Sequence, residues 1–292
     1  MTGAGQSGAG QSGASAPGPT PAEALAAIAR IAHAETGIVL ATGGTAMLRA
    51  RLDRRLRRIG LTGYPAYLAH LTAPAGRGER RHLISALTTN ESQFFREPHH
   101  FALLHDQILP ALVARARDGQ RVRLWSAGCA MGQEAYSAAM LLLDLMPDAA
   151  SHDIRILATD IDEDMIDRGR SAVFATADLA PVPAGLRTRM TEPVPGGLRP
   201  CAALRALVRL RPLNLHDDWP MRQHFDVILC RNVAIYFTPA AQDRLWHRLS
   251  AALAPAGWLF IGHSEHLPAA VATGFDRAGI TSYRRLVPAP AR

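Results

Sequence analysis

Hydrophobic and polar residues alternate with a helical period through the N-terminal part of the chain, from Pro21 to about Thr89. Thr20 followed by Pro21 predicts the start of the first helix, because threonine caps a helix N-terminus and proline suits its first position. Further short helices are expected near residues 64–71 and 79–87. We therefore expect residues 22–89 to form a small all-helical domain.

The pattern changes after about residue 120, where short β-rich apolar runs alternate with helical stretches. The apolar runs are 121–126, 154–159, 225–230 and 258–262, and the helical stretches are 134–145 and 239–253. Strands that alternate with helices imply βαβ units and a mostly parallel sheet, so the predicted fold class of residues 120–292 is α/β.

Four other segments complete the expected organisation. Dense prolines and glycines at about 173–211 indicate an insertion into the α/β domain, and residues 282–286 are expected to add an edge strand. Residues 90–119 are interpreted as a linker segment and a connecting helix. Residues 1–21 are of low complexity and are expected to form a flexible tail.

One predicted helix, at residues 46–59, is strongly basic. Leu48, Leu52, Leu56 and Ile59 form its apolar stripe, and arginines occupy the other faces, among them Arg54, Arg55, Arg57 and Arg58. Such a surface suits an acidic partner, since arginine binds carboxylates in a planar fork. The alternative is a solvated face without a partner.

Composition narrows the class of protein. The 292 residues are 48% hydrophobic and 20% charged, which is an ordinary globular balance. No apolar run reaches the roughly 18–20 residues of a membrane-spanning helix, and the N-terminus lacks the pattern of a secretory signal. The three cysteines form neither a disulfide framework nor a Cys-x-x-Cys pair. We therefore expect a soluble, cytoplasmic protein without a metal site.

The net charge of +7 is weak evidence for nucleic-acid binding. All 32 basic side chains are arginine and none is lysine, which indicates a compositional bias of the whole chain. We therefore do not expect nucleic acid as a partner.

A glycine-containing turn follows the first predicted strand. Gly128 and Gly132 lie between this strand and the next helix, where glycine lets the backbone approach a ligand and the helix N-terminus offers free N–H groups. The spacing is not Gly-x-Gly-x-x-Gly, which counts against a dinucleotide. The alternative is a tight βα turn that binds nothing.

Two further strands end in polar residues. Asp160 ends the second strand, where a carboxylate accepts both hydroxyls of a ribose; the alternative is that it caps the following helix. Arg231 and Asn232 end the strand at 225–230, and Tyr236 follows four residues later. Ligands in open α/β sheets bind beyond the carboxyl ends of the strands, so we expect these side chains to meet one.

A polar segment lies at the expected domain junction and contains Asn90, Ser92 and Arg96. Clefts between domains are preferred ligand sites. The adjacent pair His99–His100 suggests a metal, but no third histidine or carboxylate lies nearby at helical ligand spacing. We predict no metal.

Taken in order along the chain, these motifs resemble the bacterial chemotaxis receptor methyltransferases of the CheR type. The resemblance covers about residues 22–286. It rests on the motifs at 87–97, 125–129 with 132–137, 158–162, 213–215, 225–237 and 262–265. It implies a Rossmann-like domain that binds S-adenosyl-L-methionine and contains a small inserted subdomain, preceded by the all-α domain.

The resemblance also implies site residues. It places the cofactor, which leaves as S-adenosyl-L-homocysteine, against Asn90, Ser92, Arg96, Glu134, Asp160, Asn214, Leu215, Arg231 and Asn232. We predict that Arg96 and Tyr236 orient the substrate carboxylate. The chain departs from the family pattern at Ser92, usually threonine, at Ala130, Met131, Gln133 and Ala135 in the glycine turn, and at Thr238, usually a carboxylate.

The implied function is methylation of glutamate side chains on chemoreceptors, with the cytoplasmic domains of methyl-accepting receptors as partners. We expect a monomer with no direct membrane insertion. Three alternatives remain open here. They are a nicotinamide-dependent oxidoreductase, a nucleic-acid methyltransferase that uses the Pro200-Cys201 dipeptide, and a non-catalytic module that senses S-adenosylmethionine.

Overall fold

The computed structural model describes residues 18–38 and 44–287; most of the predicted N-terminal tail lies outside the described residues. The first part of the chain is helical, with α1 (Pro21–Thr36), α2 (Gly44–Ile59), α3 (Tyr64–Thr72) and α4 (Arg77–Leu87), and a short 3-10 turn at Pro74–Gly76. The predicted start of α1 is confirmed. The Thr20 hydroxyl accepts the Glu23 N–H at 3.3 Å, and the Glu23 carboxylate accepts the Thr20 N–H at 2.8 Å.

The helices pack around a core that contains the predicted apolar stripe of α2. Leu48, Leu52 and Leu56 are buried in it, and Ile59 packs against its edge. An amphipathic helix gains most of its stability from burying such a stripe. The predicted helices near 64–71 and 79–87 are confirmed as α3 and α4.

Arg55 of α2 is not a surface group. Arg55 donates two hydrogen bonds to the Glu79 carboxylate, at 2.8 and 2.6 Å, and the buried Tyr67 hydroxyl donates to the same carboxylate at 2.7 Å. The prediction that Arg55 faces a partner is therefore wrong. Its long side chain reaches across to α4, where its planar fork matches the Glu79 carboxylate.

The rest of the chain forms an α/β domain. Its main-sheet strands are β1 (Val122–Ala127), β2 (Ile154–Asp160), β5 (Val208–Pro212), β6 (Phe225–Cys230), β7 (Leu253–Ile261), β8 (Phe275–Gly279) and β9 (Ser282–Arg285). Its helices are α5 (Pro98–Leu103), α6 (Leu109–Arg117), α7 (Gln133–Leu145), α8 (Glu163–Ser171), α9 (Ala184–Met190), α10 (Ala202–Leu207), α11 (Pro239–Ala252) and α12 (Ala269–Ala272). A π-helical turn at Leu104–Ile108 joins α5 to α6.

The seven strands form one sheet in the order β5-β2-β1-β6-β7-β9-β8, parallel except for β9. Helices cover both faces of the sheet, so the side chains that point to either face of a strand are buried. On β6, Val227 and Leu229 join the core that contains α6 and α7, whereas Ile228 and Cys230 join the core that contains α11. The predicted α/β domain with a mostly parallel sheet is confirmed.

Two predicted details of this domain are wrong. The C-terminal bound of the insertion predicted at about 173–211 falls inside β5, which pairs with β2 and belongs to the main sheet. The β3 (Thr191–Val194) and β4 (Gly197–Pro200) hairpin before it forms a separate two-stranded sheet. The strand at 282–286 is β9, and it lies between β7 and β8 rather than at the edge. The arginine-rich sequence of β5 and the short polar β8 lack the apolar run by which the other strands were found.

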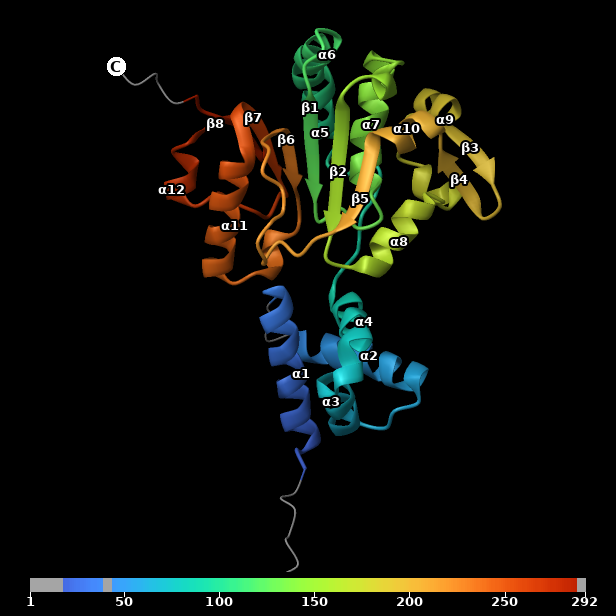
Figure 1. The fold of residues 1–292 in the computed structure, drawn as a ribbon, viewed down its shortest axis with the longest axis vertical. Helices are drawn as coiled ribbons and strands as arrows, with labels where there is room; N and C mark the ends of the chain where they lie inside the picture. Colours follow the sequence, from blue (N-terminus) through green and yellow to red (C-terminus); the bar gives the residue numbers. More distant parts are fainter. Residues whose placement is uncertain (1–17, 39–43, 288–292) are drawn as a thin grey trace, which may run out of the picture.

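The helical unit lies below the carboxyl ends of the parallel strands (Figure 1). Arg81 of α4 forms ion pairs with Glu163, Asp164 and Asp167 of α8 at 3.1–3.5 Å. The Asn214 amide donates to the backbone oxygen of Glu35 at 2.7 Å. These contacts connect the helical unit to the edge of the sheet where ligands of α/β proteins bind. None of the described helices is long and apolar enough to cross a membrane.

Replacing Glu79 with glutamine is expected to destabilise the helical unit by about 2–4 kcal/mol, because it leaves the Arg55 charge in the core without its partner. Burial raises the pKa of Glu79, but the hydrogen bonds from Arg55 and Tyr67 outweigh it, so the net pKa lies below the ordinary value. A lowered pKa adds stability above the unfolded-state pKa that is lost as the pH falls through the folded-state value. Urea unfolding of both proteins between pH 3 and 7 measures this difference.

The matched control is Glu192→Gln, which breaks the more exposed pair with Arg199 in the β3–β4 hairpin. This change is expected to cost less than about 1 kcal/mol. Equal losses for Glu79→Gln and Glu192→Gln, or a Glu79→Gln loss that does not shrink in acid, would contradict the structural role of the pair.

Candidate active site

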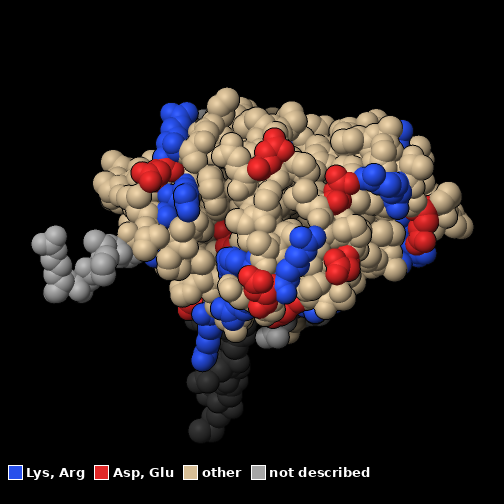
Figure 2. Space-filling view, turned by 90° about the horizontal axis from the view of Figure 1, so that it is seen from above, with Lys and Arg blue, Asp and Glu red and all other residues tan. Residues whose placement is uncertain are grey.

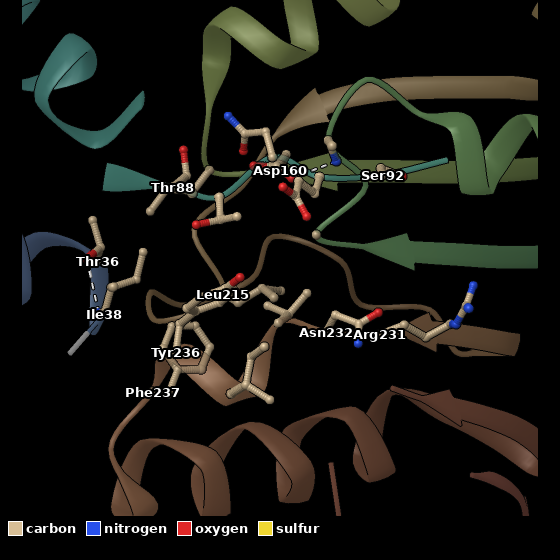
Figure 3. Close-up of a pocket in the computed structure, with 18 of the residues that line it drawn as sticks. Thr36, Ile38, Thr88, Ser92, Asp160, Leu215, Arg231, Asn232, Tyr236 and Phe237 are labelled. Carbon is tan, nitrogen blue, oxygen red and sulfur yellow. Dashed lines mark hydrogen bonds between the residues drawn. The ribbon is translucent and has the colours of Figure 1, made fainter. Parts of the chain in front are cut away.

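One pocket lies where the carboxyl ends of the strands face the helical unit. All ten residues predicted from the sequence to bind cofactor or substrate line it: Asn90, Ser92, Arg96, Glu134, Asp160, Asn214, Leu215, Arg231, Asn232 and Tyr236. They come from the segment before α5, from α7, and from the ends of β2, β5 and β6. Figure 3 shows labelled members of this set arranged around one cavity.

The glycine turn lets two backbone segments approach closely. Gly128 has φ +79°, and a Cβ atom there would lie 2.2 Å from a methyl group of Val233. Only glycine fits this combination of left-handed backbone and close contact. The turn then continues through Ala130, whose N–H donates to the Asp160 carboxylate at 2.8 Å. The turns after β1 and β6 are thereby packed together with the end of β2.

Asp160 is a buried carboxylate with capacity for a ligand. Its oxygens accept the N–H groups of Ala130 and Asp162, at 2.8 and 2.9 Å, and within the described residues it forms no ion pair. Burial raises its pKa above the ordinary value. Asp160 does not cap α8, since Asp162 does so by accepting the N–H groups of Asp164 and Met165. The helix-cap interpretation of Asp160 is therefore wrong.

Asp162 also connects the polar segment to the sheet. Its second oxygen accepts the Asn90 amide at 2.7 Å and the Thr88 hydroxyl at 3.1 Å. Asn90 thus lines the pocket while its side chain is held by the residue that caps α8. Sequence reasoning missed this function of Asp162, although the motif that contains it was noted.

Arg231 is a buried cation held by two acidic groups. Its side chain donates to Glu134 at 2.9 Å and lies 3.4 Å from an oxygen of Glu97, and it also donates to the backbone oxygen of Arg96. The second oxygen of Glu134 accepts the Ser126 hydroxyl at 2.6 Å. One guanidinium therefore joins the end of β6 to α7 and to the polar segment before α5.

The turn after Arg231 is shaped by another carboxylate. Glu265 accepts the N–H groups of Gly262, Asn232, Val233 and Ala234 at 2.6–3.0 Å. Asn232 itself has φ +60°, a left-handed conformation that asparagine tolerates better than most residues. Glu265 therefore supports the backbone that places Asn232 at the pocket.

The end of α1 contributes to the pocket, which was not predicted. Thr36 and Ile38, at the end of α1, line the cavity together with Tyr236 and Phe237, and Ile38 pairs with Phe237 through a backbone bridge (Figure 3). No sequence motif marks this helix end, so only the packing of the two domains shows that it lines the pocket.

Thr238, which replaces the usual family carboxylate, caps α11 by accepting the Ala241 N–H at 3.2 Å.

The surroundings of His99 and His100 differ from the expectation that no carboxylate lies near them. A carboxylate does lie beside them, since ligand atoms of Glu97, His99 and His100 fall within 4.8 Å of one another. Glu97 and His100 are three residues apart, and the His100 Nδ1 lies 3.5 Å from a Glu97 oxygen, so this carboxylate does lie at helical spacing and the sequence expectation overlooked it. The guanidinium of Arg231, 3.4 Å from Glu97, already neutralises this carboxylate and repels a second cation.

The cysteines lie in positions unsuited to nucleophilic catalysis. Cys201 ends the β3–β4 hairpin at the start of α10 and is not among the residues that line the pocket. Cys129 and Cys230 are buried, and burial raises the pKa of both thiols. The position of Cys201 removes the structural basis for the nucleic-acid methyltransferase alternative, which needs a cysteine nucleophile at the cofactor.

An open α/β sheet with a glycine turn after β1 and an acidic residue at the end of β2 binds nucleoside cofactors at its carboxyl edge. Two family profiles match the chain. One is described as "CheR methyltransferase, SAM binding domain" and matches residues 90–284; the other is described as "CheR methyltransferase, all-alpha domain" and matches residues 23–88. The fold and the site are therefore those of an S-adenosylmethionine-dependent methyltransferase, and this cofactor replaces the nicotinamide alternative.

Curated relatives agree over most of the chain. The "Probable chemotaxis protein methyltransferase" of Rhizobium etli is 40% identical over 86% of this chain and 96% of its own length. The "Chemotaxis protein methyltransferase 2" of Pseudomonas aeruginosa is 39% identical over 79% and 82%, and the Escherichia coli "Chemotaxis protein methyltransferase" is 38% identical over 82% of each chain. The chain belongs to the CheR methyltransferase family and catalyses S-adenosylmethionine-dependent methylation in chemotaxis.

Proposed function

We propose that this enzyme methylates the side-chain carboxylate of glutamates in the cytoplasmic domains of chemoreceptors, and that it acts in the cytoplasm as a monomer. The proposal rests on the contacts of the Arg96 side chain, which lines the pocket. Its guanidinium donates to the backbone oxygen of Glu91 at 2.9 Å but, within the described residues, forms no ion pair. An arginine without an acidic partner beside a cofactor pocket is suited to bind a substrate carboxylate.

The proposed reaction needs no proton transfer to activate the substrate. A glutamate side chain is already ionised at neutral pH, because its pKa is about 4.3. S-adenosylmethionine supplies the methyl group already activated on a sulfonium. The residues of the pocket must bring the carboxylate oxygen into line with that methyl group and exclude water. We assign the alignment to Arg96 and to the hydroxyl of Tyr236.

We assign the cofactor to the nine pocket residues named from the sequence. Asp160 would accept the ribose hydroxyls. Its remaining hydrogen-bonding capacity supports this, as does the absence of a cationic partner for it among the described residues. Gly128 and Ala130 of the turn after β1 line the same pocket, which supports a ligand against that turn. The apolar side chains of Ile38, Leu215 and Phe237 would flank the base.

We further propose that α2 docks the acidic helices of the receptor. Arg54, Arg57 and Arg58 are exposed on α2 and form no ion pair among the described residues, whereas Arg55 belongs to the core. The far end of the molecule is different: basic and acidic side chains lie intermixed on the face drawn in Figure 2. The alternative is that these arginines form a solvated surface without a partner, in a chain that is rich in arginine.

Replacing Asp160 with asparagine is expected to raise the Kd of S-adenosylmethionine about 10- to 100-fold, because charged hydrogen bonds to the ribose are lost. The raised pKa of Asp160 adds a pH signature. Wild-type affinity should fall on acidification at a higher pH than an ordinary aspartate would give, and the variant should lack this fall. Calorimetric titration between pH 5 and 8 tests both; an unchanged Kd in the variant would refute the assignment.

Replacing Arg96 with alanine is expected to lower kcat for receptor methylation about 100-fold, and replacing Tyr236 with phenylalanine about 10-fold, because the carboxylate loses its alignment. The assay transfers labelled methyl from S-adenosylmethionine to receptor-enriched membranes and tests the product for base-labile ester. Near-normal turnover in both variants would remove these residues from catalysis. Label without base-labile ester would instead refute glutamate methylation.

Charge reversal at Arg54 and Arg58 is expected to raise the receptor KM about 10-fold at low salt and to weaken its salt dependence, because opposite charges steer the two surfaces together. The Kd of the cofactor should not change. Arg121→Glu, an exposed site just before β1, is the matched control and should leave the receptor KM unchanged. An unchanged KM across a salt series in the α2 variant would favour the solvated face.

A further inference from the structure

The backbone on both sides of Arg96 is strained. Phe95 has φ 53° and Glu97 has φ 57°, and both are side-chain-bearing residues in the left-handed region. Such conformations cost of order 1–3 kcal/mol each and persist only where the surrounding structure enforces them. The residue between them, Arg96, is the one that reaches the pocket.

Two contacts enforce this conformation from outside the segment. The Phe95 N–H donates to the hydroxyl of Ser137, a buried residue of α7, at 3.0 Å. The guanidinium of Arg231 donates to the backbone oxygen of Arg96. Arg96 is therefore positioned by its main chain, and Arg231 is the anchor on the side of the sheet.

The anchor depends in turn on two carboxylates. The Arg231 side chain is 3% exposed, with Glu134 at 2.9 Å on one side and Glu97 at 3.4 Å on the other. The Phe101 ring lies 5.6 Å from its guanidinium carbon. When one of its two carboxylate partners is removed, a buried guanidinium turns toward the remaining carboxylate, or water enters to hydrate it.

Glu97 remains ionised in this environment. Burial raises its pKa, but the charge of Arg231 and the hydrogen bond from His263 outweigh burial, so the net pKa lies below the ordinary value. Unlike Arg96, Arg231 and Glu134, Glu97 is not among the residues that line the pocket. Any effect of Glu97 on methyl transfer must therefore pass through the groups it holds.

We propose that Glu97 is a positioning residue for methyl transfer: its carboxylate holds Arg231 in place, and Arg231 holds the main chain of Arg96 so that the Arg96 side chain meets the substrate. This inference rests on the proposed substrate-binding role of Arg96. It assigns to Glu97 no contact with cofactor or substrate.

The test is Glu97→Gln, which keeps the shape of the side chain and removes its charge. We expect kcat for receptor methylation to fall about 10-fold, since small displacements of an aligning group cost one to two orders of magnitude. The Kd of S-adenosylmethionine should rise much less than kcat falls, because Arg231 keeps Glu134 as a partner, and the melting temperature should stay close to wild type. Glu192→Gln, which removes one carboxylate from an exposed arginine pair, is the matched control and should keep full activity.

A double variant separates positioning from a general structural role. In an Arg96→Ala background, Glu97→Gln should lower kcat no further, because residues that act through one another are non-additive. Additive losses would overturn the inference, and so would wild-type activity in Glu97→Gln or a cofactor Kd that rises in step with the loss of kcat. Glu97→Asp, which keeps the charge with a shorter reach, should give an intermediate kcat, and it replaces Glu97→Gln if that variant does not fold.

Failure of this inference is distinguishable from failure of the proposed function. If Arg96→Ala loses activity and Glu97→Gln does not, only the role of Glu97 is refuted. If Arg96→Ala keeps activity, the proposed role of Arg96 fails first, and the inference about Glu97 fails with it. If wild-type enzyme forms no base-labile ester on receptor, the substrate proposal is wrong, whatever the variants do.

Discussion

The site depends on one buried charge, the guanidinium of Arg231. It stands at the end of β6, in the interior between the sheet, α7 and the segment before α5, where an unpaired charge would be very costly. Glu134 and Glu97 supply the compensating charge from two different parts of the chain. Because each partner must come to Arg231, the positions of α7 and of residues 90–97 are coupled to the end of the sheet.

The carboxyl edge of a parallel sheet brings the ends of several strands together, and here the helical unit completes the cavity. Asp160 ends β2 and Arg231 follows β6, the two strands on either side of β1, while Thr36 and Ile38 arrive from the end of α1. The pocket is thus shared between the two parts of the chain. The ion pairs of Arg81 with α8 and the hydrogen bond from Asn214 to Glu35 join those parts next to the same pocket.

The basic helix α2 serves two physical purposes. Arg51 and Arg55 turn inward, where Arg51 donates to backbone oxygens at the end of α4 and Arg55 pairs with Glu79. Arg54, Arg57 and Arg58 remain exposed. The same residue type therefore fastens α2 to α4 on one side and leaves a positive surface on the other, and sequence spacing alone does not separate the two groups.

The sequence by itself determined the helical unit, the strands with apolar runs and all ten predicted residues of the pocket. Helix periodicity, buried strands and the ends of parallel strands follow local rules, which located the elements and Asp160, Arg231 and Asn232. Glu134, Asn214 and Leu215 followed only from the resemblance to the family. Tertiary structure alone decided that Arg55 is internal, that β5 joins the sheet, that α1 lines the pocket, and that Glu97 lies against Arg231. In each case the partner is distant in sequence, and a side chain's partner depends on how separate elements pack rather than on its own neighbours along the chain.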